Sequence, residues 1–504
     1  MAFSTSASRA SRSSFDTADI SAISFDYQVT LRATFSIIEQ YTGGTFMPTS
    51  PPHVIIIGAG TGGLCLAQGL KQGGVSVAVY ERDRTRTDGL FGYRVGIDPD
   101  GSRALSRCLP PELFDVFVAT KALTPRFMNI FTERRSELLR IGDWDAPEHE
   151  DPVDSEKSIS RMTLRQVLLT GVEDIVHFGK KFTHYEQHAD GTVTAYFEDG
   201  TSASGDVLVA ADGTNSRVRK QYLPHSKMNT IDGKSVTAKL PLDDESRKLL
   251  TPEMLRGVNL VNAPGGYNCI IHVMEFKWDR DGKVKNGIGG NDAQLLSHWP
   301  GLMFDNTRDY IMWGWSAPSR LVPDNFMDLR GEELHKIVLQ HTRKWHPDFR
   351  KLFEMADPGS AFPLQVRTTE RLEPWESTNV TLIGDAIHTM TPGLGVGANT
   401  ALRDAEILCR RLIAARRGET TAVEAVAAYE KEMHSYAWTL VEKSKSQFGG
   451  NLPLGTPVIG RLMLGFMRTG MRVFNHLPAM KRKMLKSMEE TRGHGKEAEA
   501  PASK

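Results

Sequence analysis

The sequence has few cysteines and no excess of charge of either sign. Its four cysteines, in a chain of 504 residues, lie far apart and form no CxxC pair, so neither a zinc site nor a disulfide framework is indicated. Lys and Arg together number 61, as do Asp and Glu, so no overall field points to nucleic acid or to an anionic membrane. The chain also lacks an apolar run of the roughly 18 residues that a spanning helix needs. These features favour a globular protein of a reducing compartment, and we expect it to be cytoplasmic.

The first 50 residues do not look like part of a core. Their first 15 positions are rich in Ser, Ala and Arg and contain no acid, a composition that transit peptides share. We interpret residues 1–50 as a disordered or atypical extension, with organelle targeting and a start at Met47 as the alternatives. We predict that residues 1–46 can be removed without loss of folding.

The clearest motif begins at His53. Four β-branched apolar residues, Val54 to Ile57, predict a short parallel strand that is buried on both faces. Gly58, Gly60 and Gly63 follow at the GxGxxG spacing, and an apolar-periodic helix begins. In such a unit the first glycine permits the tight turn, the second lets a pyrophosphate approach, and the third lets helix and strand pack closely. The stretch predicts a dinucleotide site at a helix N-terminus.

A second strand, Val75–Tyr80, ends at an acid in the expected position. Glu81 lies 23 residues after Gly58, where a carboxylate can bind the ribose hydroxyls of an adenosine. The same carboxylate would repel a 2′-phosphate, so the site suits FAD or NAD better than NADP. Arg82, the next residue, is included among the cofactor-binding candidates.

Two later segments repeat the pattern of a buried strand followed by a polar loop. The apolar run Val207–Ala211 is followed by Asp212, and the run Val380–Ile383 is followed by Gly384 and Asp385. Ligands of parallel sheets bind at such strand ends. A carboxylate there can accept hydrogen bonds from sugar-alcohol hydroxyls. The glycine-rich loop after Asp385 delivers a helix N-terminus, which would stabilise the negative charge of a reduced flavin. The candidates on that loop are Pro392, Gly395, Gly397, Ala398 and Asn399.

Two connections between these units contain further candidates. The segment Phe91–Arg103 is either a surface connection or an approach to the cofactor through Arg94 and Gly96. Arg161 precedes the helical pattern Met162–Leu169, so it is either a solvated residue or a contact to a phosphate or to the flavin edge.

The middle of the chain has a different character. Residues 225–365 carry longer strands, more aromatic residues and polar turns, which predicts a separate antiparallel-sheet domain. A hairpin near residues 125–142 is expected to contribute to the substrate side of the protein, together with this domain. We therefore predict an α/β protein with a Rossmann-like FAD-binding domain (51–224 and 366–440), an interleaved substrate domain (225–365) and a basic helical tail (441–504).

The three motifs together resemble those of a known family. Gly58-x-Gly60-x-x-Gly63, Asp212–Gly-x-x-Ser-x-x-Arg219 and Gly384–Asp385 with its Pro-x-x-Gly-x-Gly-x-Asn loop occur in the order found in single-component flavoprotein monooxygenases of the para-hydroxybenzoate hydroxylase fold. The likeness covers roughly residues 52–440. It implies that the first and third motifs bind FAD, that the second contacts FAD and NAD(P)H, and that Arg161 contacts the flavin. Ala210, Ile387 and Ala401 depart from the family pattern.

The resemblance also implies a reaction. NADPH or NADH would reduce the flavin, O2 would give a C4a-hydroperoxide, and one oxygen would pass to an electron-rich ring or double bond. A phenolic substrate would need a base, and the only weak candidates are Tyr267 and His272. They lie five residues apart on one predicted strand, hence on opposite faces, so at most one faces a pocket, and a core or surface role is favoured for each.

Other functions fit parts of the pattern. Met312–Pro318 is similar to the W-x-W-x-I-P segment of flavin-dependent halogenases, with Ala317 in place of Ile, although its tryptophans could simply pack the sheet. Another FAD oxidoreductase or a non-enzyme dinucleotide-binding protein are further alternatives. The second motif favours a hydroxylase or epoxidase. The aromatic middle domain suggests a large apolar substrate of aromatic, polyketide, terpenoid or indole type.

The tail is basic and rich in methionine. Methionines recur every four residues in two blocks between Met463 and Met488, accompanied by Lys and Arg. Such a stripe can seat a helix on its own protein or on a dimer mate, which we favour, or lie on a membrane surface.

Overall fold

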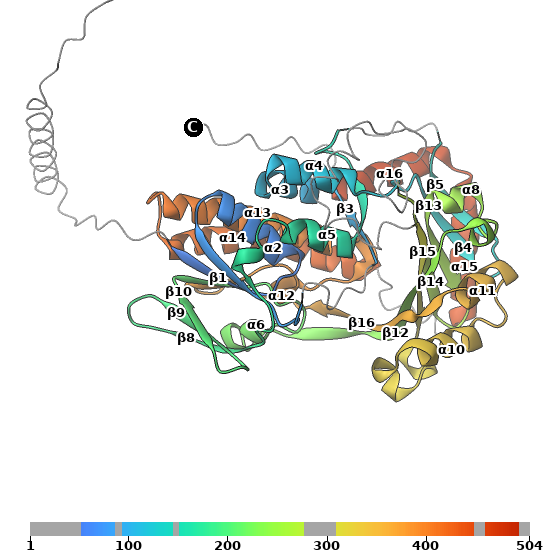
Figure 1. Cartoon of the computed structure of the whole chain (residues 1–504). Helices are drawn as coiled ribbons and strands as arrows, with labels where there is room; N and C mark the ends of the chain where they lie inside the picture. The colour runs from blue at the N-terminus through green and yellow to red at the C-terminus, as the bar shows by residue number, and fades with distance from the viewer. Residues whose placement is uncertain (1–51, 86–92, 145–150, 277–308, 448–458, 493–504) are drawn as a thin grey trace, which may run out of the picture. The chain divides into compact units, whose positions relative to one another are not determined.

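The computed structural model describes residues 52–85, 93–144, 151–276, 309–447 and 459–492 (Figure 1). The predicted N-terminal extension, residues 1–50, lies outside these ranges. Everything below concerns the unit that begins at Pro51.

A five-stranded parallel sheet forms the first core. Its order is β17-β11-β1-β2-β7, so the three strands that precede the sequence motifs are neighbours. The long apolar side chains of β1 and β11 are nearly all buried, as their unbroken apolar runs predict. The strands are β1 (His53–Ile57), β2 (Ser76–Tyr80), β7 (Val176–His177), β11 (Val207–Ala210) and β17 (Val380–Leu382).

Helices cover this sheet and pack on one another. The long helix α13 lies against α2, α3 and α14 (Figure 1), although it follows α2 by more than 300 residues. This return of the chain confirms a Rossmann-like domain built from separate segments. The helices are α2 (Thr61–Gln72), α3 (Pro99–Cys108), α4 (Pro111–Ala119), α5 (Arg161–Leu169), α13 (Gly397–Arg416) and α14 (Ala422–Gln447).

A seven-stranded sheet forms the second core. Its order is β16-β12-β15-β14-β13-β4-β5, and all its neighbours are antiparallel except β13 and β4. This confirms an antiparallel sheet interleaved with the Rossmann-like domain. The strands are β4 (Phe127–Thr132), β5 (Glu137–Gly142), β12 (Met228–Pro241), β13 (Gly257–Ala263), β14 (Tyr267–Met274), β15 (Tyr310–Ala317) and β16 (Asp357–Thr369).

The two faces of this sheet differ. On the outer face, Trp313 and Trp315 are fully buried in a cluster with Phe349 and Phe353 of helix α11 (Pro347–Glu354), beside helix α10 (Gly331–His341). On the inner face, Met312 belongs to the core of the Rossmann-like domain. The two tryptophans are therefore core residues, and their presence does not support an aromatic substrate.

Two smaller sheets and two terminal helices complete the described chain. β3 (Arg94–Ile97) pairs with β6 (Lys157–Ser160), and β8 (Phe182–Gln187), β9 (Val193–Phe197) and β10 (Ser202–Gly205) form a three-stranded sheet. Helices α15 (Ile459–Asn475) and α16 (Pro478–Thr491) lie beside β5 (Figure 1). No helix among the described residues is long and apolar enough to cross a membrane.

Candidate functional site

The first glycine turn shows which glycines the fold requires. Gly58 has a φ of +108°, and a Cβ atom on it would sit 2.5 Å from the carbonyl oxygen of Ala211. A Cβ atom on Gly63 would collide with the carbonyl oxygen of Gly58. At Gly60 the nearest atom to such a Cβ is 3.9 Å away, so the protein leaves space there. Gly58 and Gly63 are thus explained by packing, whereas Gly60 leaves room for a ligand.

Glu81 is fixed beside this turn. Its side chain is buried, and Oε2 accepts the backbone N–H of Ala59 at 2.6 Å while Oε1 accepts that of Asp83 at 3.0 Å. Arg165 lies on the same side, 3.1 Å from the Asp83 carboxylate. The structure therefore places a carboxylate at the end of β2 next to the glycines, as the sequence predicts. Arg82 is exposed.

The second motif is tied to the third by Arg219. This side chain is buried, and its Nη1 donates to the carbonyl oxygen of Ala386 at 2.7 Å while Nη2 donates to that of Thr214 at 2.8 Å. Asp212 accepts the backbone N–H of Arg217 at 2.9 Å, and burial raises the pKa of its carboxyl. Arg219 therefore joins the loops that follow β11 and β17 at the same edge of the parallel sheet.

Asp385 is the exposed acid of the third motif, although the three residues after it are buried. The surrounding protein raises the pKa of its carboxyl, while the charges of His388, Arg161 and Arg219 act in the opposite direction. Arg161 is also exposed, and its Nη1 lies 3.1 Å from the hydroxyl of Tyr93. The structure thus brings Asp385 and Arg161, which are far apart in the sequence, into electrostatic range.

A buried network lies behind Asp385, and the sequence reasoning missed it. Asp404 on α13 accepts the N–H of Gly384 at 2.7 Å, Nε2 of His388 at 2.6 Å and the hydroxyl of Tyr436 at 2.5 Å. Burial lowers the pKa of His388, but the charge and hydrogen bond of Asp404 outweigh it and raise that pKa above its ordinary value. The role of Asp404 could have been predicted from the sequence. In the helix that follows the glycine-rich loop, this acid lies on the same face as Ala401, Ile407 and Leu408.

The glycine-rich loop leads into α13 and is held from behind. Asn399 is buried, and its Nδ2 donates to the carbonyl oxygen of Gly96 at 2.9 Å while its Oδ1 accepts the N–H of Asp98 at 3.1 Å. The side chain of Asn399 therefore joins α13 to β3, a role that the sequence did not suggest. Pro392 and Gly395 are exposed, and Gly397 and Ala398 are half-buried at the first turn of α13.

Arg94 and Gly96 lie on β3, at the side of the site that faces the seven-stranded sheet. The Nε atom of Arg94 donates to the hydroxyl of Ser158 at 2.7 Å. Burial lowers the pKa of Arg94 to about 10, an effect that the nearby Glu156 opposes. The half-buried Gly96 follows on the same strand, so the segment is a wall of the site and not a free surface connection.

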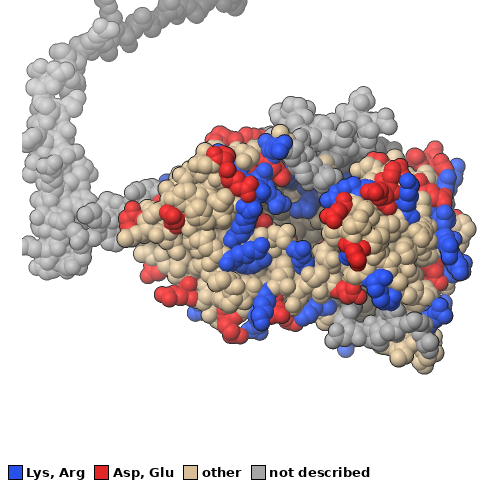
Figure 2. All heavy atoms as spheres, turned by 90° about the horizontal axis from the view of Figure 1, so that it is seen from below, with Lys and Arg blue, Asp and Glu red and all other residues tan. Residues whose placement is uncertain are grey.

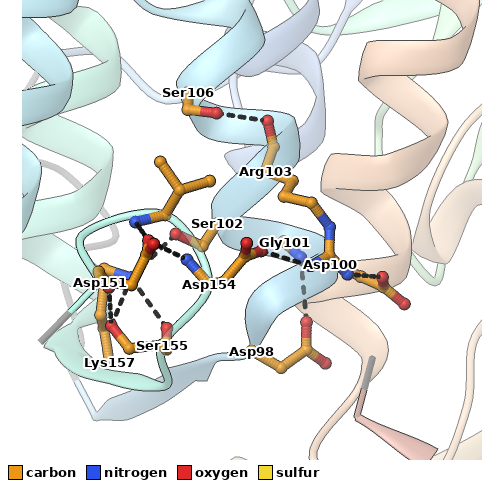
Figure 3. A network of polar contacts seen from close by, with 11 residues as sticks. Asp98, Asp100, Gly101, Ser102, Arg103, Ser106, Asp151, Asp154, Ser155 and Lys157 are labelled. Carbon is orange, nitrogen blue, oxygen red and sulfur yellow. Dashed lines mark hydrogen bonds and ion pairs between the residues drawn. The ribbon is translucent and has the colours of Figure 1, made fainter. Parts of the chain in front are cut away.

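A polar network supports this wall from the side of α3 (Figure 3). The Nζ atom of Lys157 donates to the Ser102 hydroxyl at 2.9 Å and to the Ser155 carbonyl oxygen at 2.8 Å, and burial lowers the pKa of Lys157 to about 7. Asp98 caps α3 by accepting the N–H of Gly101 at 2.9 Å, and burial raises the pKa of Asp98 to about 7. These contacts fix β3 and β6 against the helix.

The two residues considered as bases lie on opposite faces of the seven-stranded sheet. Tyr267 packs against Trp315 on the outer face, and its hydroxyl lies 2.9 Å from Nδ1 of His341. His272 stands opposite Met312 and so belongs to the inner face. Burial, with the charge of Arg94, holds the pKa of His272 well below its ordinary value, so its imidazole is neutral. Its Nδ1 is buried and has no hydrogen-bond partner in the described part of the chain.

The inner face of this sheet carries apolar side chains that are not fully buried. Ile270, Gly314, Thr237 and Phe362 stand opposite one another across four strands, and Ile270 and Phe362 are only half-buried. Leu364, two residues beyond Phe362, is 36% exposed. The ring of Tyr93, which precedes Arg94, stacks on Phe362 with 6.4 Å between centroids. The molecule is hollowed near the middle of the face in Figure 2, with Lys and Arg at the edge of the hollow.

The residues present fit FAD. The space at Gly60 and the neighbouring carboxylate of Glu81 suit the adenosine and pyrophosphate half of FAD. The exposed carboxylate of Asp385 suits the half that carries the flavin. The residues before α2 and α13 are Gly60 and Val396, whose side chains cannot cap a helix, and the first turn of neither helix contains an acid. Both N-termini are therefore suited to negative charge.

Comparison with known proteins supports the same cofactor. A family model described as "FAD binding domain" matches residues 302–444. The dual O-methyltransferase/FAD-dependent monooxygenase CTB3 of Cercospora beticola is 31% identical over 414 residues, which cover 79% of this chain and 46% of that protein. This chain thus spans about half the length of that relative. The FAD-dependent monooxygenase thnD of Trichoderma harzianum is 29% identical, with 71% of this chain and 82% of that protein covered.

A solved structure agrees with these matches. The structure comes from Photorhabdus luminescens subsp. laumondii and is assigned to the FAD-containing monooxygenases. It is 31% identical, has a TM-score of 0.64 and covers 78% of this chain and 96% of that protein. Since the match runs over nearly the whole of that relative and the three motifs converge on one site, the chain belongs to the class A FAD-dependent monooxygenases.

Proposed function

We propose that the protein binds FAD, takes electrons from NADPH or NADH, and uses O2 to hydroxylate or epoxidise a large apolar substrate. The observation that carries this proposal is that two different surfaces meet at the site, one on the Rossmann-like domain and one on the seven-stranded sheet. One carries Asp385, Arg161 and the uncapped N-terminus of α13, and the other is the inner face of the seven-stranded sheet, with the half-buried Ile270 and the exposed Leu364. FAD, when bound, supplies the hydride-accepting and oxygen-activating chemistry.

The chain's own residues bind and orient the cofactor. Glu81 and the space at Gly60 suit the adenosine and pyrophosphate half, and Asp385 suits the hydroxyls between the phosphates and the ring. The N-terminus of α13 would stabilise negative charge on the reduced ring. Arg161, held next to Tyr93, would contact the ring edge, and Arg94 would form the adjoining wall.

On the substrate side, His272 is the candidate proton acceptor. It is buried on the inner face, and its Nδ1 has hydrogen-bonding capacity left unused by the described residues, so it can accept a hydrogen bond from a substrate hydroxyl. Burial and the charge of Arg94 hold its pKa well below the ordinary value, which makes it a weak base. Apolar walls exclude water, which protects an oxygen-transfer reaction from wasteful side reactions. An aromatic, polyketide, terpenoid or indole-type molecule would fill such a surface.

The halogenase alternative gains no support from the geometry. Its motif residues Trp313 and Trp315 are fully buried on the outer face, away from the inner face that adjoins the Rossmann-like domain.

The test is to purify the protein with its flavin and to measure NADH and NADPH oxidation, with and without aromatic and polyketide-like compounds. We expect a yellow protein, substrate-stimulated oxidation of the reductant, and a product heavier by one oxygen atom. Oxidation that needs a separate flavin reductase and halide would contradict the proposal, and a colourless protein that binds no FAD would overturn it.

A further inference from the structure

Helix α15 has two apolar faces, and the described residues pack against only one of them. Met471 and Phe474 lie on the apolar cluster of β4 and β5, together with Met484 of α16. Four other apolar side chains of α15 are exposed. They are Ile459 (58% of its surface exposed), Leu462 (61%), Phe466 (78%) and Val473 (57%). Their spacing of three, four and seven residues places them on one face of the helix, opposite the packed side chains. We call these four residues the apolar stripe.

The packed face is fixed by specific polar contacts. Arg468 donates to the Asn262 carbonyl oxygen at 2.6 Å and pairs with Glu133 at 2.5 Å. Asn475 accepts the N–H of Arg140 at 3.0 Å. At the far end of α16, Arg492 pairs with Glu156 at 2.6 Å. The helix is therefore anchored on the seven-stranded sheet in a defined orientation, and the stripe is the face that this orientation leaves outward.

The stripe is not an ordinary scatter of surface residues. Of the ten large apolar side chains that are exposed in the described chain, seven lie between Ile459 and Leu485. Contiguous exposed apolar surface marks an interaction site more often than an isolated side chain does. The segment from Ile459 to Met488 also contains seven Lys and Arg and no acid, and Arg461, Arg472, Arg482, Lys483 and Lys486 are exposed.

We propose that α15 and α16 dock on a membrane surface that contains anionic lipid. An amphipathic helix with an apolar face and neighbouring cations binds such a surface by inserting the apolar side chains and attracting the headgroups. A second copy of the chain is a poorer partner, because a symmetric contact through this segment would bring cations against cations. An acidic leaflet has the complementary charge and accepts Phe466 and Leu462 without a preformed groove.

The test uses the full-length, flavin-loaded protein and flotation with two kinds of vesicle, phosphatidylcholine alone and phosphatidylcholine with phosphatidylserine. We expect binding to the acidic vesicles that weakens with added salt. Phe466→Ser together with Leu462→Ser should weaken it by roughly tenfold or more. Arg482→Gln, Lys483→Gln and Lys486→Gln together should weaken it by about fivefold for each charge removed.

Val423→Ser is the matched control, because Val423 is an exposed apolar residue on α14 with 42% of its surface exposed and should leave vesicle binding unchanged. Flavin absorbance and the melting temperature report whether each variant is folded. Equal flotation of the stripe variant and the control, or equal binding to both kinds of vesicle, would overturn the proposal. So would a dimer in sedimentation equilibrium that the stripe variant abolishes while no vesicle binding is seen.

Discussion

Oδ2 of Asp404 lies 2.6 Å from Nε2 of His388 and accepts the backbone N–H of Gly384 from 2.7 Å. One buried oxygen of α13 therefore holds both ends of the short turn on which Asp385 is carried. Asp404 and His388 can therefore affect the position of Asp385 without contacting a ligand themselves. The orientation of the Asp385 carboxylate depends on this arrangement.

We predict that Asp404→Asn destabilises the protein and lowers its FAD content. The change removes the charge that His388 and Gly384 share, and loss of one partner of a buried charged pair costs about 3 kcal/mol or more. Tyr436→Phe removes only the third hydrogen bond to Asp404 and should cost about 1 kcal/mol. Urea unfolding measures the stability of both variants, and the flavin-to-protein absorbance ratio measures their FAD content. Equal losses in the two variants would contradict the central role of Asp404.

The same pair predicts a pH dependence. The pKa of His388 is raised in the folded protein, so its protonation stabilises the fold below the ordinary histidine pKa of about 6.5. This contribution is lost as the pH rises through the higher folded pKa. His388→Gln should therefore cost more stability near pH 6 than near pH 9. A cost that is independent of pH, measured by urea unfolding of both proteins, would show that His388 is not charged in the fold.

Gly58 and Gly60 should respond differently to alanine. Gly58→Ala puts a Cβ atom 2.5 Å from the Ala211 carbonyl oxygen at a φ of +108°, so we expect about 3 kcal/mol or more of destabilisation and little folded protein. Gly60→Ala meets no protein atom closer than 3.9 Å and should change the stability of the FAD-free protein by only about 0.5 kcal/mol.

The second variant should nevertheless bind FAD poorly, because its methyl group occupies the approach of the pyrophosphate. Titration of the flavin-free protein with FAD measures this. Normal FAD affinity in Gly60→Ala would contradict the placement of the pyrophosphate at this turn.

Tyr267 and His272 form a second matched pair, on opposite faces of β14. Tyr267→Phe removes a hydroxyl that bonds to His341, so it should cost about 1 kcal/mol of stability and leave turnover nearly unchanged. His272→Gln should keep the bound FAD but lower turnover by about a hundredfold if a phenolic substrate needs the base. The check is steady-state kinetics with a pH profile, and a larger effect of Tyr267→Phe on turnover would reverse the assignment.

Leu364 tests the apolar wall of the proposed substrate site. Because this side chain is 36% exposed, Leu364→Glu can fold, but it places a charge where an apolar substrate must lie. We expect KM for the substrate to rise at least about tenfold with FAD content unchanged, whereas Leu364→Met should resemble the original protein. Unchanged KM in the glutamate variant would place the substrate elsewhere.

The local features of the site could be predicted from the sequence because each depends on neighbouring residues. Glycines at fixed spacing and acids directly after apolar runs locate Gly58, Glu81, Asp212 and Asp385 without any knowledge of the tertiary structure. The five-stranded sheet follows from the same apolar runs. The order of its strands was not predicted and comes from the structure.

The contacts between distant segments could not be predicted. Asn399 binds the backbone of β3 about 300 residues earlier, and nothing in its local sequence distinguishes that contact from a ligand contact. The alternation of β15 shows that Trp313 and Met312 face opposite ways, but it does not show which way is inward. That choice depends on α10 and α11, which cover the outer face.

The same alternation divides the seven-stranded sheet into two sets of positions with different freedom to change. Outer-face residues such as Ile271 are fully buried, so a change there alters the stability of the fold. On the inner face His272 and Met312 are buried, but Ile270, one position away from Ile271, is only half-buried. A change at Ile270 therefore costs less folding stability and would alter the shape of the proposed substrate site. Neighbouring residues such as Ile270 and Ile271 can therefore change independently, so substitutions at half-buried inner-face positions would reshape the proposed substrate site while the core behind them stays the same.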